Sequence, residues 1–178
     1  MLFPTIATIA LGVLPFLTAA IPVDTPTASV EAAKAHNIYL VTCVPRSRKN
    51  ENDDDTPSTA QNFTAIAYFK KPIDPAETGS KDPQPDRAAL VSQPPEAWDG
   101  VKWKVKTWRD KIFTADIASG AATLAKGEIA GNAKLGDEDY VCFKDGVTAI
   151  RIRDDDVRGK CVADYFCAGL GKGDDDGL

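Results

Sequence analysis

The four cysteines of this chain constrain its fold more than any other feature. Three of them lie close together near the C-terminus (Cys142, Cys161 and Cys167), and the fourth, Cys43, lies far upstream. An even number of cysteines behind an apolar N-terminus predicts two disulfides. No Cys-x-x-Cys pair is present, so the spacing does not indicate a zinc site or a thioredoxin-like centre.

The segment around the three C-terminal cysteines has the pattern of a β-meander. Asp145-Gly146 separates two β-rich runs, 140–143 and 147–152. This arrangement predicts a hairpin with a type I′ turn, because such a turn requires positive φ and Asp-Gly supplies it. A second turn then leads into a third predicted strand at 160–167.

The spacing of the cysteines favours one disulfide pairing. If 160–167 is one extended strand, Cys161 and Cys167 lie about 20 Å apart, whereas the Cα atoms of a disulfide lie within about 7 Å of each other. Alternation also places both cysteines on the same face of that strand. We therefore expect the disulfides Cys142–Cys161 and Cys43–Cys167. The alternative, Cys43–Cys142 with Cys161–Cys167, requires the last strand to bend in its middle.

The N-terminus predicts export from the cell. Residues 1–20 carry no charged side chain and are mostly apolar, and Thr18 and Ala20 are small residues that suit a signal-peptidase site. Pro4 and Pro15 interrupt the run, which is too short for a good membrane span. We expect a signal peptide over 1–20 and a secreted, extracellular protein without a membrane span.

Short runs of alternating residues predict a mainly β fold. The clearest run is 101–108, in which Trp103 and its second neighbours point to the face opposite the lysines. Further strands are expected at 38–44, 63–69 and 112–117. The stretch 119–136 combines alanines that favour a helix with glycines that favour turns or bulges. We expect an antiparallel sandwich or barrel with one or two short helices.

The remaining segments are assigned to termini and loops. Residues 21–36 predict an extended mature N-terminus with room for a short helix. The six prolines within 70–100 predict a long loop with one helical turn at 87–91. The glycine-rich, acidic tail, 169–178, predicts disorder. The expected organisation is therefore a single β domain over 37–168.

Side chains with catalytic chemistry are few. His36 is the only histidine, and it has no carboxylate beside it in the sequence, so Ser-His-Asp and Cys-His arrangements are not indicated. The aspartate runs 53–55, 154–156 and 174–176 are more typical of solvated turns than of a metal site. We expect no catalytic residue, metal or cofactor, while a carboxylate pair for glycoside hydrolysis stays open.

The best binding candidate is a row of lysines in the strand 101–108. Strict alternation places the three lysines on one face, in a chain whose net charge is −5. Such a row attracts phosphate, sulfate or uronate groups, and an exposed tryptophan beside it stacks on a sugar. The alternative is that the lysines protect an edge strand from aggregation. The candidate binding residues are Lys102, Lys104, Lys106, Trp108, Arg109 and Trp98.

Two further features bear on modification and partners. Asn62-Phe63-Thr64 is an N-glycosylation sequon, so we expect a glycan on Asn62. The acidic net charge argues against a globally basic nucleic-acid binder.

With its signal peptide, small size, four cysteines and proline-rich loop, the chain resembles the small secreted, effector-like proteins of filamentous fungi. The resemblance rests on these general features and not on a specific motif. The resemblance implies a non-catalytic apoplastic or effector-like role, or a cell-surface role. We therefore expect a secreted, non-enzymatic protein that binds an extracellular protein or polysaccharide. The alternatives are a carbohydrate- or polyanion-binding module that uses the Lys102/Lys104/Lys106 face, and a small secreted hydrolase with a carboxylate site.

Overall fold

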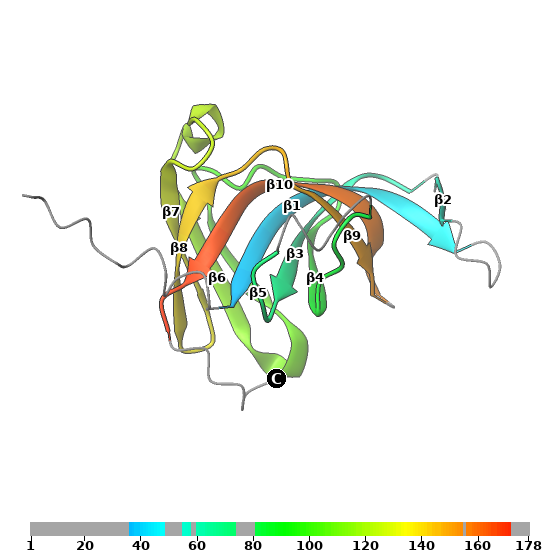
Figure 1. The fold of residues 1–178 in the computed structure, drawn as a ribbon, viewed down its shortest axis with the longest axis horizontal. Coiled ribbons are helices and arrows are strands. Elements are labelled where there is room, and N and C mark those ends of the chain that lie inside the picture. Colours follow the sequence, from blue (N-terminus) through cyan, green and yellow to red (C-terminus); the bar gives the residue numbers. More distant parts are fainter. Residues whose placement is uncertain (1–35, 49–54, 58–59, 74–80, 155, 172–178) are drawn as a thin grey trace, which may run out of the picture.

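The computed structural model describes residues 36–48, 55–57, 60–73, 81–154 and 156–171 (Figure 1). Within these residues the chain is mainly β and antiparallel, which confirms the predicted fold class. The predicted signal peptide, the short N-terminal helix and most of the acidic tail lie outside the described residues. The elements are β1 (Asn37–Arg48), β2 (Asp55–Pro57), β3 (Phe63–Phe69), β4 (Arg87–Ser92), β5 (Lys102–Lys106), the 3₁₀ helix η1 (Trp108–Asp110), β6 (Ile112–Ile117), the 3₁₀ helix η2 (Ala121–Thr123), β7 (Ile129–Leu135), β8 (Glu138–Lys144), β9 (Ala149–Arg153) and β10 (Arg158–Gly169).

One sheet contains all of these strands and curls into a nearly closed, barrel-like shape. Its order is β4-β3-β1-β10-β8-β7-β6-β5, with β2 paired to the end of β1 and β9 paired to β10. The two longest strands, β1 and β10, lie side by side at the centre (Figure 1). Among the described residues, no helix has the length and apolar character needed to cross a membrane.

The Asp145-Gly146 segment does not form the predicted hairpin. β8 and β9 each pair with β10, β8 along its C-terminal half and β9 along its N-terminal half. The backbone N–H groups of Asp145 and Gly146 donate to the carbonyls of Asp164 and Ala163. Gly146 has the predicted positive φ, 85°, but the turn docks on β10 because that strand accepts its hydrogen bonds. The second predicted turn does join β9 and β10 as a hairpin.

Both predicted disulfide pairs are wrong. The disulfides are Cys43–Cys161 and Cys142–Cys167. In each, the two cysteines lie directly opposite each other on adjacent strands, with Cα atoms 4.0 and 3.9 Å apart. The prediction assumed that β10 alternates without interruption. Instead, Leu40 pairs with Tyr165 and Val41 pairs with Ala163, so Asp164 is an extra residue that forms a bulge in β10.

The interior consists of two cores on opposite faces of the central strands, and the bulge at Asp164 changes the core that β10 faces. Tyr165 and Cys167 point into the first core, inside the barrel-like curve, whereas Cys161 and Ala163 point into the second core. β1 and β3 contribute alternate residues to both cores. Each core contains one disulfide, because the extra residue reverses the face of β10 between its two cysteines.

Two other predictions are corrected within the described residues. The predicted helical turn at 87–91 is β4, an edge strand paired with β3, since hydrogen bonding to a neighbouring strand overrides a weak helical preference. The ambiguous stretch 119–136 contains both η2 and β7. Gly131 lies at a register shift in β7, and Gly120, Gly127 and Gly136 have positive φ in the turns around it.

Candidate functional site

The lysine row lies on β5, an edge strand, and its three side chains are exposed. Lys102 Nζ lies 3.1 Å from Asp116 Oδ2, and Lys106 Nζ lies 2.8 Å from Asp110 Oδ1. Lys104 lies between these two ion pairs. The carboxylates partly neutralise the row, so this face is less basic than the sequence indicates.

The tryptophans do not form an exposed strip beside the lysines. Trp98 is only 2% exposed, and its ring centre lies 5.5 Å from that of Trp103. Trp108 opens η1, where the chain turns toward β6, and its ring centre lies 5.5 Å from that of Tyr68. The prediction that Trp108 shares the lysine face is wrong because β5 ends before it. Arg109 lies at the exposed tip of the turn.

The glycosylation sequon lies at the start of β3. Asn62 is exposed, whereas Thr64 is fully buried and its Oγ1 donates to the carbonyl of Ser92 at 3.5 Å. A glycan on Asn62 would lie outside both cores. Glycosylation stays a prediction.

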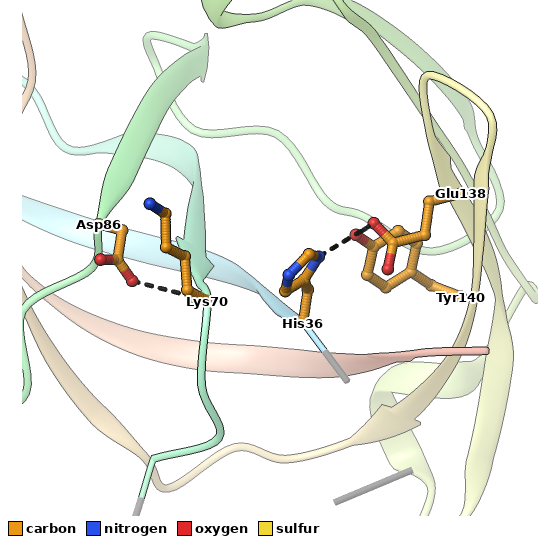
Figure 2. Close-up of polar contacts among 5 residues, drawn as sticks. All are labelled: His36, Lys70, Asp86, Glu138 and Tyr140. Atoms are coloured by element: carbon orange, nitrogen blue, oxygen red, sulfur yellow. Dashed lines mark hydrogen bonds and ion pairs between the residues drawn. The ribbon is translucent and has the colours of Figure 1, made fainter. Parts of the chain in front are cut away.

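His36 is buried. Its Nδ1 lies 3.4 Å from Glu138 Oε2, and the hydroxyl of Tyr140 donates to the same oxygen at 2.5 Å (Figure 2). Burial and the hydrogen bond to Glu138 raise the pKa of Tyr140 well above its usual value. Glu138 lies 102 residues from His36 in the chain, so the sequence gives no sign of this contact. The cluster ties the start of β1 to β8.

A hydrogen bond between a backbone N–H and a carboxylate lies near this cluster. The N–H of Lys70 donates to Asp86 Oδ2 at 2.9 Å (Figure 2). This bond fastens the end of β3 to the residue that precedes β4.

Several polar groups converge on a pocket of about 300 Å³ beside the β10 bulge. Five parts of the chain form it: β1, β8, β10, η2 and the connection between β4 and β5. The residues that line it are Thr42, Pro95, Glu96, Ala97, Trp98, Asp99, Ala122, Lys144, Asp164 and Tyr165. We call it the Asp164 pocket.

Three carboxylates line the Asp164 pocket, and each is held through one oxygen. Asp164 Oδ2 accepts from Thr42 Oγ1 at 2.7 Å, and Glu96 Oε1 accepts from a serine hydroxyl of β4 at 3.0 Å. Asp99 Oδ2 accepts from the backbone N–H that precedes η2 at 3.2 Å. Each carboxylate is therefore fixed in position while its second oxygen has no hydrogen-bond partner in the described part of the chain.

The electrostatics of the pocket centre on Asp164. Burial raises the pKa of its carboxyl group, Thr42 and Lys144 partly offset this rise, and Asp145 and Asp99 add to it. Lys144 Nζ also donates to the backbone carbonyl of Asp164 at 3.2 Å. One lysine thus faces several carboxylates, and the pocket carries net negative charge.

Sequence reasoning did not find the Asp164 pocket. Among its lining residues, only Trp98 is a sequence-based candidate, for a different role, and the carboxylates come from two segments far apart in the chain, the β4–β5 connection and β10. The fold and the pocket together define a disulfide-bonded, antiparallel β domain with an acidic site at a bulge. Comparison with protein-family models, curated proteins and solved structures finds no match to this chain.

Proposed function

We propose that this is a secreted, non-enzymatic protein that binds an extracellular partner, and that the Asp164 pocket receives a cationic group of that partner. The observation that carries the proposal is the convergence of three anchored carboxylates on one pocket. With Glu96, Asp99 and Asp164 ionised and Lys144 charged, the pocket holds −3 + 1 = −2. An ammonium or guanidinium group offers several N–H donors to such acceptors.

The shape of the pocket favours a basic side chain of a protein over a sugar. Sugars commonly stack on an exposed aromatic face. Trp98 and Tyr165 both line the pocket, but each is only 2% exposed. Its acceptors therefore suit a lysine or arginine side chain better than a saccharide ring. The two disulfides are compatible with an extracellular partner.

A titration with a minimal ligand tests this proposal. N-acetyl-arginine amide and N-acetyl-lysine amide are added to the secreted protein, and binding is followed by NMR shifts of backbone amides. We expect the largest shifts at Thr42, Asp99 and Asp164. In the variant Glu96→Gln/Asp99→Asn, binding should be lost.

A matched control distinguishes binding at the Asp164 pocket from nonspecific electrostatic attraction to the acidic protein. Asp137→Asn/Asp156→Asn makes the same change in charge at two exposed positions outside the pocket. This variant should bind as the unmodified protein does. Equal weakening in both variants would overturn the pocket assignment.

One observation favours a second candidate function, glycoside hydrolysis. Burial favours the protonated form of Asp164, as a general acid requires, and Asp99 lines the same pocket. The test is release of nitrophenol from nitrophenyl glycosides by the secreted protein. Turnover that disappears in Asp164→Asn would establish the hydrolase, and no turnover would leave the binding function.

A further inference from the structure

An exposed apolar surface adjoins the Asp164 pocket on β1, β10 and β9. Thr42, which lines the pocket, pairs with Val162 of β10, and Val162 pairs in turn with Ala149 of β9. Val44 follows Thr42 by two residues on β1. We call Val44, Ala149 and Val162 the apolar patch.

The alternation of the three strands places the apolar patch on one face. The residues next to its members, Cys43, Ile150 and Cys161, are buried in the second core. The side chains of the patch therefore point away from that core, on the same side as Thr42. They form one group because the strand register makes them neighbours.

The apolar patch is open to solvent. Val44 and Val162 are each 46% exposed, and Ala149 is also exposed. An antiparallel sheet with one solvated face ordinarily has polar residues on that face. A single exposed apolar side chain needs no explanation, whereas a group of them beside polar residues is typical of an interaction surface.

Thr42 connects the apolar patch to the pocket. Its hydroxyl donates to Asp164 Oδ2 at 2.7 Å, and its partner across the strands is Val162. Side chains directly opposite on antiparallel strands lie about 4.5–5.5 Å apart, and second neighbours on one strand about 6.6–7 Å apart. A cationic group bound beside Asp164 would therefore have both valines within reach of its neighbouring groups.

We propose that the Asp164 pocket and the apolar patch together bind an extended peptide segment of a protein partner, in which an apolar side chain lies two residues from a lysine or arginine. This inference rests on the proposed function, because it assigns the cationic side chain to the pocket. In an extended segment, second neighbours point to the same side about 6.6–7 Å apart, which matches the spacing of Thr42 and Val44.

Charge and burial favour this partner over other occupants. The net charge of −2 in the pocket selects a cation. A free polyamine would place further ammonium groups over the valines, where they lose hydration. A second copy of this chain would bring a net charge of −5 to a protein of the same charge. An apolar side chain of a peptide instead leaves water when it covers the patch.

Two pentapeptides with blocked ends test the inference by NMR titration. The first has arginine at its centre, leucine two positions away on each side, and serine elsewhere. The second, the reference peptide, has serine in place of both leucines. We expect the leucine peptide to bind about fivefold or more tightly, because its leucine side chains are buried against the valines. Nuclear Overhauser contacts should connect the leucine methyl groups with those of Val44 and Val162.

Variants of the protein locate the effect. Val44→Ser/Val162→Ser should bind the leucine peptide no more tightly than the reference peptide, and its affinity for the reference peptide should be unchanged. Ile129→Ser/Leu170→Ser removes two exposed apolar side chains outside the patch and the pocket, and it should keep the preference for leucine. If the serine variant does not fold, Val44→Thr/Val162→Thr keeps the β-branched shape and should reduce the preference.

The outcomes separate this inference from the proposed function. Binding of the reference peptide at the pocket with no increase from leucine would overturn the apolar patch and leave the proposed function in place. Failure of both peptides to bind would overturn both. Equal loss of preference in the control variant would also overturn the patch. Spermine that binds as tightly as the leucine peptide, or a dimer that Val44→Ser/Val162→Ser dissociates, would overturn the choice of a peptide.

Discussion

Asp164 of β10 accepts a 2.7 Å hydrogen bond from Thr42 of β1, although it has no partner of its own in the ladder between these strands. The bulge brings a carboxylate into a partly buried position and reverses the face of β10. The disulfide pairing and the acidic pocket both follow from this one extra residue.

We expect Asp164→Asn to stabilise the protein near neutral pH. Burial raises the pKa of Asp164 in the folded state above its pKa in the unfolded chain. At pH values between these two pKa values, the folded protein therefore binds more protons than the unfolded chain. The free energy of unfolding therefore falls through that window, and ionised Asp164 destabilises the fold above it. The asparagine keeps an oxygen acceptor for Thr42.

Calorimetry checks this prediction. The Tm of Asp164→Asn should exceed that of the unmodified protein by a few degrees near pH 7, at about 2–4 °C per kcal/mol. The gain should vanish near pH 3, where both folded and unfolded forms are protonated. A lower Tm near pH 7 would contradict the prediction, and Asp156→Asn, at an exposed site, is the control.

Loss of the two disulfides should have unequal effects. Cys43 and Cys161 are 118 residues apart in the chain, and Cys142 and Cys167 are 25 apart. In the chain-entropy model, removal costs about 4–5 kcal/mol for the longer loop and about 3–4 kcal/mol for the shorter. Denaturant unfolding of the two double Cys→Ser variants measures this order. Peptide mapping without reduction should recover these two links, and recovery of Cys142–Cys161 would refute the fold.

The tyrosines should titrate late. Burial, with Asp145, raises the pKa of Tyr39 to about 12, and burial, with Asp99 and Asp164, raises that of Tyr165 to about 12. Burial and Glu138 raise that of Tyr140 further. The pKa of each of these tyrosines is higher in the folded state than in the unfolded chain. Their contribution to the free energy of unfolding is therefore fully present below about pH 10, and it is lost as pH rises through the folded pKa values.

Ultraviolet absorbance of phenolate measures this titration. We expect most phenolate to form only above about pH 11, together with alkaline unfolding followed by circular dichroism. Tyr140→Phe should remove the last-titrating group. It should also destabilise the fold by about 1.5–3 kcal/mol, because Glu138 loses a hydrogen-bond donor. Ordinary titration near pH 10 in the folded state would contradict the prediction.

Gly131→Ala should destabilise the β6/β7 pairing. A Cβ at this position would lie 2.2 Å from the backbone oxygen of Asp116. Since neither strand can move freely in the sheet, we expect a cost of about 1–3 kcal/mol or more. Gly127→Ala is the comparison, because it meets no atom within 4 Å and carries only the strain of its positive φ of 88°. Denaturant midpoints should fall further for Gly131→Ala.

Replacing the lysine row should have little effect on polyanion binding. Because Lys102 and Lys106 already pair with carboxylates, we expect Lys102→Glu/Lys104→Glu/Lys106→Glu to elute close to the unmodified protein from a heparin column. Early elution of this variant in its folded form would instead locate a polyanion site on β5.

The sequence by itself determined the local structure of much of this protein. The predicted strands 38–44, 63–69 and 112–117 correspond to β1, β3 and β6. Gly146 has positive φ, and β9 and β10 form a hairpin, as predicted. These features depend on turn chemistry and on side-chain alternation over a few residues, which a sequence displays directly.

Only the tertiary structure decided which strands are neighbours and which side chains meet. Strand alternation assigns a face within one strand, but it does not reveal a bulge, and the single extra residue at Asp164 reversed the face of Tyr165 and Cys167. The contact of His36 with Glu138 and the acidic pocket join segments that are distant in the chain. Their geometry depends on sheet register, because register sets which residues on adjacent strands lie opposite each other.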